Sequence, residues 1–382
     1  MRARRKTAND THLISPTKPK ALEKSQLEKK QSGARAIRSE GQFERGGPSN
    51  GLAKTVSPGT PANGRVPMGE WRGDKKAPIL TQLKDLLLAA IASPSKAARA
   101  HATKVLDAYA KSLKAGYPGE GEIEGSTEFK DYMQRTMAKD GFEWDILRLS
   151  RPGSSAALAG LNVNVFDAAR AADWSRSAKA PGPRYAAIEQ GFARKTLAPD
   201  QAATFFEAGL AHLKSQNVPF VIMELNDPRI MTEEKMQEDD KRTPYRVDHA
   251  VYMARFGMRS PPATYAQLDL LRDDDAGSVN HLALGIIPTD PSVTSIRADE
   301  YLAIVKGYFS TFKVVRDEAK ENGVNPGEIV EADPVYQSIK ASVAGRKVLP
   351  LQDPRTDWMK LAAPNGRKLD ARTAERWLPN ER

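Results

Sequence analysis

This chain of 382 residues has a formal net charge of +10, and its composition excludes several kinds of site. It contains no cysteine, so disulfides, thiolate metal sites and a cysteine nucleophile are excluded. Its five histidines form no His-x-x-x-His pair, which argues against a zinc site. No apolar run approaches the ~18 residues of a membrane-spanning helix, and no apolar segment of a Sec signal peptide follows the basic start.

The excess positive charge is confined to the first part of the chain. Residues 1–76 contain 17 lysines and arginines against 7 acidic residues, whereas the remaining 306 residues carry 41 of each. The segment 1–76 is rich in Lys, Arg, Ser, Gly and Pro and has almost no apolar periodicity, so we expect a disordered basic tail. We interpret it as a solvated linker or an export leader. An arm for an anionic partner is the alternative, although the aromatic residues used in base stacking are missing.

Periodicity divides the rest of the chain into three parts. Residues 77–140 are predicted to be the helical N-terminal part of the domain, and residues 141–345 the α/β domain itself. Residues 346–382, which are again basic and punctuated by prolines, are predicted to be a C-terminal tail.

The helical part contains three apolar repeats of helical spacing. The first predicts a helix from Ile79 to Ile91, and the second predicts a helix that ends at Gly116. The third predicts a shorter helix with Ser126 or Thr127 as its N-cap.

From residue 141 the apolar period changes from near four to two. Segments 143–150, 156–168 and 183–195 are typical of consecutive strands, segment 198–216 of a helix, and segment 219–227 of the next strand. Three adjacent strands predict an antiparallel meander, and the strand–helix–strand unit predicts a parallel pair. The sequence therefore predicts a mixed α/β fold, in which a twisted mixed sheet has helices on its faces.

The later segments continue this alternation. VDHAVYMARFG predicts a short helix that ends at Gly257, and ATYAQLDLL and HLALGIIP predict two strands. RADEYLAIVKGYFSTF and DPVYQSIKASVAG predict helices.

Three of these stretches resemble the GNAT superfamily of acyl-CoA N-acyltransferases. NVPFVIMELNDP is similar to the family's fifth strand, and AVYMARFGMRS to its short helix with an aromatic–x–x–x–Gly–x–Arg turn. The segment from ATYAQLDL to DPVYQSIKASV is similar to a bacterial branch that ends in a tyrosine-containing strand, a buried strand and two helices. The resemblance covers residues 140–345, is best over 215–345, and implies a GNAT-like fold.

The resemblance also implies a mechanism. In the family the fourth and fifth strands splay apart, the pantetheine of the acyl-CoA inserts between them, and the following helix presents its N-terminus to the pyrophosphate. By position, Glu224 would be the general base for an amine, and Asn226 would contact the pantetheine. The tyrosine that protonates the leaving thiolate falls on Met253 here, so its neighbour Tyr252 is the candidate, turned by about 100° on the helix.

The loop for the pyrophosphate departs from the family. That loop is normally rich in glycine, but FARKTLAPDQAATFF contains none, and Pro199 would remove an N–H donor. Asp200 would place negative charge at the same point. Arg194, Lys195 and Thr196 are the candidate residues for binding the cofactor's phosphates instead.

Structural interpretations of the same residues stay open. Glu224 would pair with Arg229 or Arg246, and Asn226 and Asp227 would form a turn.

The sequence thus predicts an acyl-CoA-dependent N-acyltransferase that moves an acetyl group from acetyl-CoA to a small amine or a protein lysine. The alternative is an exported bacterial effector, or a binding module on a GNAT-like fold that has lost acetyl-CoA chemistry. We expect a cytoplasmic location or export without a Sec signal. The acidic loop MTEEKMQEDDK favours a cationic acceptor. The acceptor's identity and the oligomeric state are not predicted.

Overall fold

The fold is described from a computed structural model over residues 78–116, 125–176, 181–194, 196–197, 199–227, 229–232, 253–268 and 279–357. The predicted disordered tail, residues 1–76, lies outside this range. Within it, seven strands form one sheet in the order β1-β2-β3-β4-β5-β7-β6. The bounds of these strands, in chain order, are Ile79–Gln82 (β1), Phe142–Ser150 (β2), Ala157–Asp167 (β3), Arg184–Ala193 (β4), Phe220–Asn226 (β5), Tyr265–Gln267 (β6) and Val279–Pro288 (β7).

The strand directions confirm both predictions made from the period-two segments. β2, β3 and β4 form an antiparallel meander, and β4 pairs in parallel with β5 after the crossover through α7 (Pro199–Lys214). β5–β7 and β7–β6 are antiparallel. The chain therefore has a mixed α/β fold with a mixed sheet flanked by helices, as expected for a GNAT-like protein.

Helix α7 covers one face of the sheet. Its predicted apolar side, Phe205, Phe206, Leu210 and Leu213, is buried as expected from the spacing. These side chains share a hydrophobic cluster with Ile188 and the other residues of β2–β5 that point toward α7. Burying each such side chain contributes about 1.5–3 kcal/mol, so this contact fixes the crossover against the sheet.

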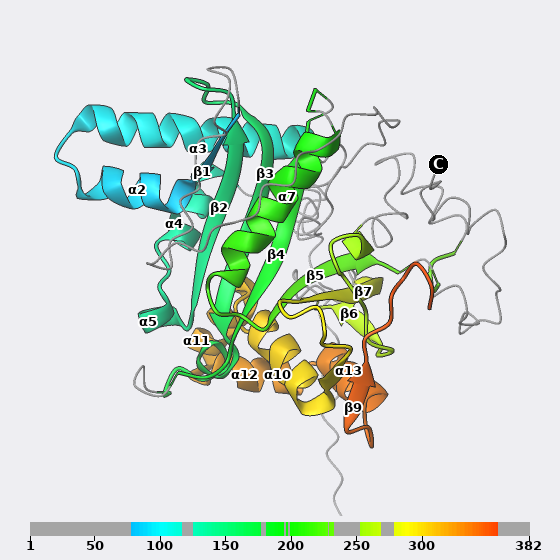
Figure 1. The fold of residues 1–382 in the computed structure, drawn as a ribbon. Helices are drawn as coiled ribbons and strands as arrows, with labels where there is room; N and C mark the ends of the chain where they lie inside the picture. Colours follow the sequence, from blue (N-terminus) through cyan, green and yellow to red (C-terminus); the bar gives the residue numbers. More distant parts are fainter. Residues whose placement is uncertain are drawn as a thin grey trace, which may run out of the picture.

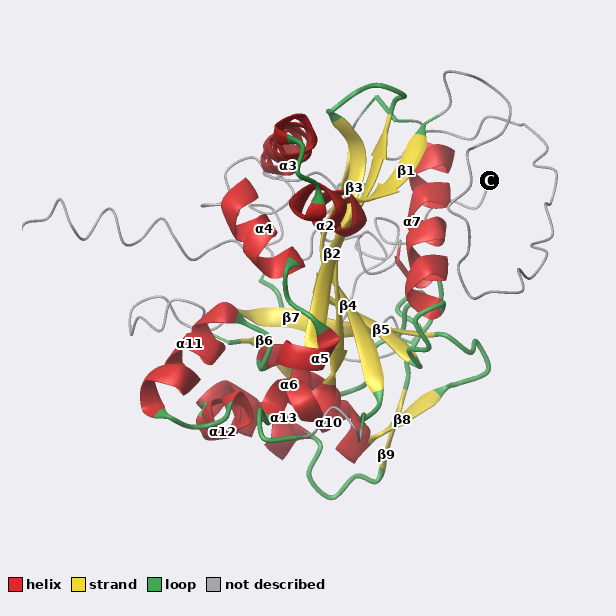
Figure 2. Ribbon diagram, turned by 90° about the vertical axis from the view of Figure 1, so that its left-hand side faces the viewer, coloured by secondary structure: helices red, strands yellow, loops and turns green. Residues whose placement is uncertain are grey.

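Two groups of helices cover the opposite face (Figure 2). The first, here the α2–α4 cover, consists of α2 (Leu83–Ala92), α3 (Lys96–Gly116) and α4 (Ser126–Met133). The second, here the α10–α13 cover, consists of α10 (Ala298–Phe309), α11 (Lys313–Asn322), α12 (Pro326–Ala332) and α13 (Pro334–Ser342). Two short helices, α5 (Met137–Asp140) and α6 (Ala168–Ala172), lie at the ends of β2 and β3.

The first predicted helix is shorter than expected. Residues from Ile79 to Gln82 form β1 and pair with β2, so α2 begins only at Leu83. The third predicted helix has Gly125 as its N-cap, one residue before the predicted Ser126. The helical spacing of the apolar residues could not reveal the strand, because pairing with a distant segment decides it.

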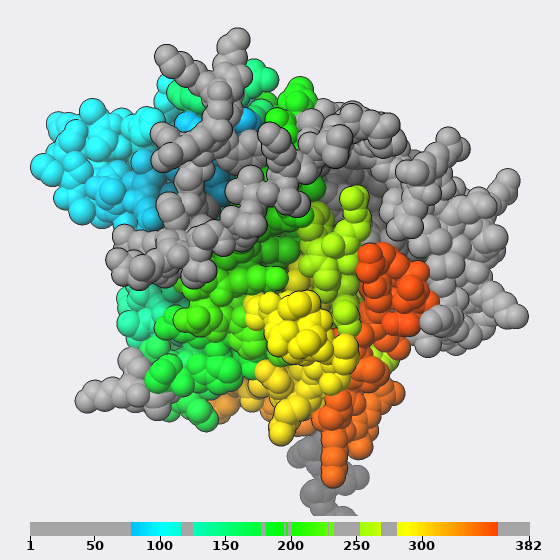
Figure 3. Space-filling model, in the orientation of Figure 1, coloured from blue at the N-terminus to red at the C-terminus, as the bar shows by residue number. Residues whose placement is uncertain are grey.

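The predicted C-terminal tail contains an ordered strand. Residues Val348–Pro350 form β9, which pairs with β8 (Ser295–Arg297) in a second, small sheet. In Figure 3, α2 and α3, in blue and cyan, project from one side of the molecule, and the orange C-terminal segment that contains β9 lies on the other side. In the part of the chain that the structure describes, no helix combines the length and the apolar character needed to cross a membrane.

Candidate active site

The parallel pairing of β4 with β5 is short. It consists of Ala186↔Val221, Ala187↔Ile222 and Ile188↔Met223. Beyond that last pair β4 continues to Ala193 and β5 to Asn226, and Figure 1 shows the two strands running apart. The divergence is the splay that the resemblance implies.

A β-bulge lies at the start of the divergence. β3 and β4 pair through Val163↔Ile188 and then through Asn162↔Gln190, which leaves Glu189 as an extra residue in β4. A bulge of this kind re-aims side chains. Both Glu189 and Gln190 consequently hydrogen-bond to β3 side chains on the face opposite α7.

Glu189 is held by neutral donors from two neighbouring strands. Its Oε2 accepts from Trp144 Nε1 at 2.6 Å, and its Oε1 accepts from Asn164 Nδ2 at 3.0 Å. The same Asn164 nitrogen donates to Thr311 Oγ1 at 3.0 Å, which ties the network to the α10–α13 cover. Burial raises the pKa of the Glu189 carboxyl, although the hydrogen bonds from Trp144 and Asn164 act to lower it. The residue nevertheless remains partly exposed.

Gln190 belongs to a second polar chain on this face. Its Oε1 accepts from Asn162 Nδ2 at 2.5 Å, and Asn162 Oδ1 accepts from the Tyr109 hydroxyl of α3 at 2.7 Å. Burial, and next the nearby Asp145 carboxylate, hold the pKa of Tyr109 well above its usual range, so the hydroxyl keeps its proton and stays a donor. Buried amides on a central strand therefore form a polar band between the two helical covers.

Glu224 is the first residue of β5 beyond the last β4–β5 pair, and it is buried. Its Oε1 accepts from the Tyr265 hydroxyl at 2.5 Å, and its Oε2 accepts from Gln267 Nε2 at 2.9 Å. Both donors come from β6, so the carboxylate reaches across β7. Burial, and then the charge of Glu224, hold the pKa of Tyr265 well above its ordinary value, which keeps the phenol protonated.

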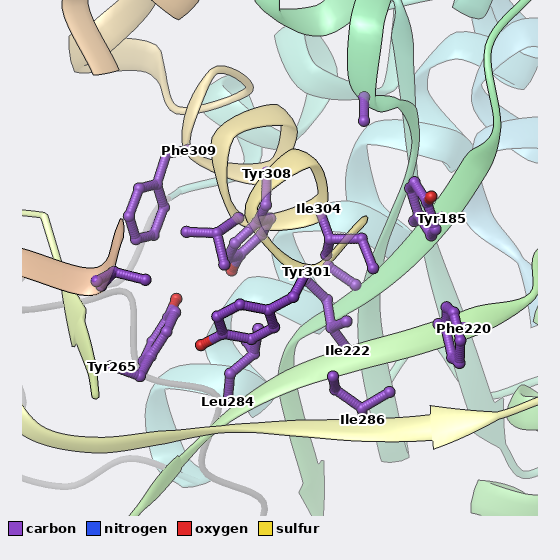
Figure 4. Packing of buried hydrophobic residues seen from close by; sticks show 14 of the residues in the cluster. Tyr185, Phe220, Ile222, Tyr265, Leu284, Ile286, Tyr301, Ile304, Tyr308 and Phe309 are labelled. Carbon is purple, nitrogen blue, oxygen red and sulfur yellow. The ribbon is translucent and has the colours of Figure 1, made fainter. Parts of the chain in front are cut away.

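The wall beside Glu224 is aromatic. Figure 4 shows Tyr265 and Tyr301 in the hydrophobic cluster that fills the space under the α10–α13 cover. The Tyr301 hydroxyl is buried and has no hydrogen-bond partner among the described residues. Burial raises the pKa of this phenol as well.

The structure places the predicted site residues in two regions, one at the divergence and one at the far end of β4. Glu224 and Asn226 are two residues apart on β5, and both are buried, on the face opposite α7. Arg194 follows the end of β4, about 20 Å along the strand from Ile188. It is exposed, and its Nη2 donates to Ser112 Oγ of α3 at 3.0 Å.

The remaining predicted residues lie in or beside parts of the chain that the structure does not describe. Thr196 is exposed in the turn between β4 and α7. Lys195 and Tyr252 lie outside the described residues. The roles of all six predicted residues stay predictions.

Arg229, one of the two alternative partners predicted for Glu224, pairs with the neighbouring Asp227. Arg229 forms a two-point ion pair with Asp227, at 2.8 Å from Nε to Oδ1 and 2.6 Å from Nη2 to Oδ2. The Asp227 Oδ1 also accepts from the backbone N–H of Arg229, which closes the turn predicted after β5. Arg246 lies outside the described residues.

Sequence reasoning missed four polar residues of this region. Glu189 and Asn164 lie on the β3 side of the divergence, and Tyr265 and Gln267 on the β6 side. The signal for Asn164 was present in NVNVF, since asparagines alternate with valines on a strand buried on both faces. The tyrosine of β6 was noted only as part of the resemblance.

Comparisons with known proteins add little to this description. No protein-family model matches the chain, and no curated protein is significantly similar to it. Among solved structures it is similar to FeeM, an N-acyl amino acid synthase from uncultured soil microbes, at 10% identity and a TM-score of 0.30. That match covers 56% of this chain and 92% of FeeM. A likeness this weak supports no conclusion, so the fold assignment rests on the strand order and directions of the chain itself.

Proposed function

We propose that this chain is an N-acyltransferase, which takes the acyl group of a thioester such as acetyl-CoA and transfers it to an amine. The observation that carries the proposal is the end of the parallel β4–β5 ladder at Ile188 and Met223. Strands that run apart within one sheet present edges to which an extended ligand can add, as peptides do in β-augmentation. The bulge at Glu189 stands at the same point and supports a site there.

The proposed residues divide the work between holding the thioester and moving protons. Glu224 is the general base for the amine, and Tyr265 and Gln267 fix its carboxylate in one orientation. Asn226 contacts the pantetheine, and Tyr252 donates a proton to the leaving thiolate. The acyl thioester supplies the acyl group, and the acceptor is a small amine or a protein lysine.

The phosphates of the thioester are proposed to lie at the start of α7. In a glycine-rich loop, backbone N–H groups would bind the phosphates. Here the positive charges of Arg194 and Lys195 and the hydroxyl of Thr196 take that role. The Arg194 side chain is exposed at this end of β4, where it can turn toward a ligand.

One observation favours a second candidate function. Helix α7 begins at Pro199, whose nitrogen carries no hydrogen, and so the helix offers one donor fewer to a pyrophosphate. A GNAT-like binding module without acyl transfer is therefore the alternative. A test of thioester binding separates the two functions, because only the acyltransferase is expected to bind an acyl-CoA.

The deciding experiment is isothermal titration calorimetry with acetyl-CoA and, in parallel, a longer acyl-CoA. We expect wild type to bind at a dissociation constant between about 1 μM and 1 mM. Arg194→Ala should weaken binding about fivefold to tenfold, since one charge-assisted contact to phosphate is lost. Arg184→Ala removes the same side chain from the opposite end of β4 and should bind like wild type.

The possible results separate the proposals. Binding of the longer ester alone would keep acyl transfer and reject the acetyl group as the one transferred. Absence of binding by either ester would reject acyl transfer and leave the binding module.

A further inference from the structure

We infer that Glu189 and Asn164 form a subsite for the ammonium group of a primary amine, on the β3 side of the β4–β5 divergence. This inference deepens the proposed acyl transfer and rests on it for the identity of the cation. It assigns a binding function to residues that neither the sequence motifs nor the proposed mechanism uses.

Glu189 is a carboxylate without a counter-charge in the described part of the chain. Its two hydrogen-bond donors, the Trp144 indole and the Asn164 amide, are neutral, and no lysine, arginine or histidine of the described segments forms an ion pair with it. A partly buried carboxylate of this kind is normally paired, because its desolvation is costly. Each of its oxygens accepts one hydrogen bond, and a carboxylate offers about four acceptor positions.

Asn164 provides an independent indication of a ligand. Its side chain is 1% exposed, both amide hydrogens are used by Glu189 and Thr311, and its Oδ1 has no hydrogen-bond partner in the described part of the chain. Turning the amide over would point the oxygen at the Glu189 carboxylate, so the observed orientation is the favourable one. A buried oxygen without a partner costs about 1–3 kcal/mol until a donor reaches it.

The remaining hydrogen-bonding capacity of this pair consists of acceptors only. Thr311 adds no donor, since its hydroxyl donates to the Tyr308 carbonyl at 2.7 Å. An ammonium group carries only donors and a positive charge, so it satisfies the Asn164 oxygen and neutralises Glu189 at once. A water molecule could donate to the Asn164 oxygen but could not neutralise the charge of Glu189. A metal ion would need further ligands, and the described residues contain no group of three or more His, Asp or Glu side chains that could hold one.

The position of the pair connects it with the acyl acceptor. The bulge places Glu189 directly after the last β4–β5 pair, where the proposed thioester enters. A primary amine has a pKa of about 10 and so arrives as an ammonium at neutral pH. Held by Glu189 and Asn164, its nitrogen would stand beside the divergence.

Trp144 makes the subsite observable, because its indole N–H donates to the Glu189 carboxylate. The test uses the full chain with ¹⁵N-labelled tryptophan, and the Trp144 indole signal is assigned with Trp144→Phe. Propylammonium chloride is titrated, with propan-1-ol, sodium chloride and magnesium chloride as comparison probes. We expect a saturable shift of the Trp144 signal with propylammonium alone.

Variants decide whether the pair causes the shift. Glu189→Gln keeps an acceptor for the indole, and it should weaken propylammonium binding by about tenfold or more. Asn164→Ala, a second variant, should weaken it several-fold. Glu143→Gln is the matched control, because it removes a carboxylate adjacent to Trp144 that pairs with Lys84 instead, and it should bind like wild type. The indole signal of Trp174, whose ring packs under the Arg316 guanidinium at 5.5 Å, reports whether each variant is folded.

The outcomes are distinct from those of the acyl-CoA experiment. No shift in wild type, an equal shift with propan-1-ol or magnesium, or equal loss in Glu143→Gln would overturn the subsite. Propylammonium binding to a chain that binds no acyl-CoA would support the subsite and reject acyl transfer. Acyl-CoA binding without a propylammonium shift would support acyl transfer and reject the subsite.

Discussion

Glu189 and Glu224 occupy matching places on two neighbouring strands, since each directly follows the last pair of the β4–β5 ladder. Their carboxylates turn in opposite directions. Glu189 is held by Trp144 and Asn164 on the β2–β3 side, and Glu224 by Tyr265 on the β6 side. Both lie on the face opposite α7. The divergence is thus flanked by two oriented carboxyl groups, which the proposed transfer to an amine would use for binding and for proton removal.

The first prediction concerns the proposed base. Glu224→Gln should lower kcat for acyl transfer by about 10²–10⁴-fold, because an amide cannot accept the proton of the amine, and it should leave acetyl-CoA affinity unchanged. Calorimetry and a steady-state thiol-release assay measure the two quantities. Glu300→Gln is the control, since Glu300 also accepts from a tyrosine hydroxyl, that of Tyr185 at 3.1 Å, away from the divergence. Equal loss in both variants would remove Glu224 from the mechanism.

The second prediction compares two buried tyrosines of the same cluster. Tyr265→Phe removes a 2.5 Å hydrogen bond to the buried Glu224 carboxylate and should lower the free energy of unfolding by about 1.5–3 kcal/mol. Tyr301→Phe removes a buried hydroxyl without a partner among the described residues, so it should be neutral or stabilising by up to about 1 kcal/mol. Urea denaturation measures both. A Tyr301→Phe variant as unstable as Tyr265→Phe would mean that the Tyr301 hydroxyl has a partner.

The strands of this fold were predictable where one local rule decides them. In β3, Val163 and Val165 alternate with Asn162 and Asn164, and this period of two predicted a strand whatever the rest of the chain does. The parallel β4–β5 pair followed from a strand, a helix and a strand in that order. Position at the end of the strand likewise put Glu224 at the divergence.

The rest depended on contacts between distant segments. The extra residue at Glu189 arises from the registry between β3 and β4, which no periodicity contains. The bond from Tyr265 to Glu224 requires β7 to lie between β5 and β6, and this order is not sequential. Leu80 has helical spacing with later leucines, yet it lies in β1 because β2 is there to pair with it. Local patterns therefore found Glu224 and Asn226 but missed Glu189, Asn164, Tyr265 and Gln267 around the divergence.

The third prediction uses two helix glycines as a matched pair. Alanine is favoured over glycine in a helix by about 1 kcal/mol in both cases. At Gly307 of α10, however, a Cβ would lie 2.5 Å from the Ala168 backbone of α6, whereas at Gly209 of α7 it would meet the tip of the Leu161 side chain at 2.6 Å. The Ala168 backbone cannot move as easily as the end of the flexible Leu161 side chain. Gly307→Ala should therefore lower the free energy of unfolding by about 1–3 kcal/mol, and Gly209→Ala by less, as urea denaturation would measure. Equal effects would mean that α6 and α10 move apart easily.

The fourth prediction is a pH dependence of stability that originates at Asp145. This buried carboxylate accepts from the backbone N–H of Lys84, in the first turn of α2, at 2.9 Å and from Gln82 Nε2 at 3.1 Å. Burial nevertheless raises the pKa of Asp145 from 3.8 to about 6, because these hydrogen bonds offset only part of the cost of desolvation. The folded chain therefore holds this proton more tightly than the unfolded chain does.

The sign follows from this difference in proton binding. Between about pH 4 and pH 6 the unfolded chain has lost the Asp145 proton while the folded chain still holds it, so stability falls as the pH rises. Relative to Asp145→Asn, wild type should lose up to about 3 kcal/mol over this window and no more above it. Urea denaturation across the window measures the difference. Asp299→Asn is the control of opposite sign, because the hydrogen bond from Arg297 lowers the pKa of Asp299. A wild-type to Asp145→Asn difference that does not change with pH would mean that Asp145 is ionised throughout, and α2 would then begin on a charged cap.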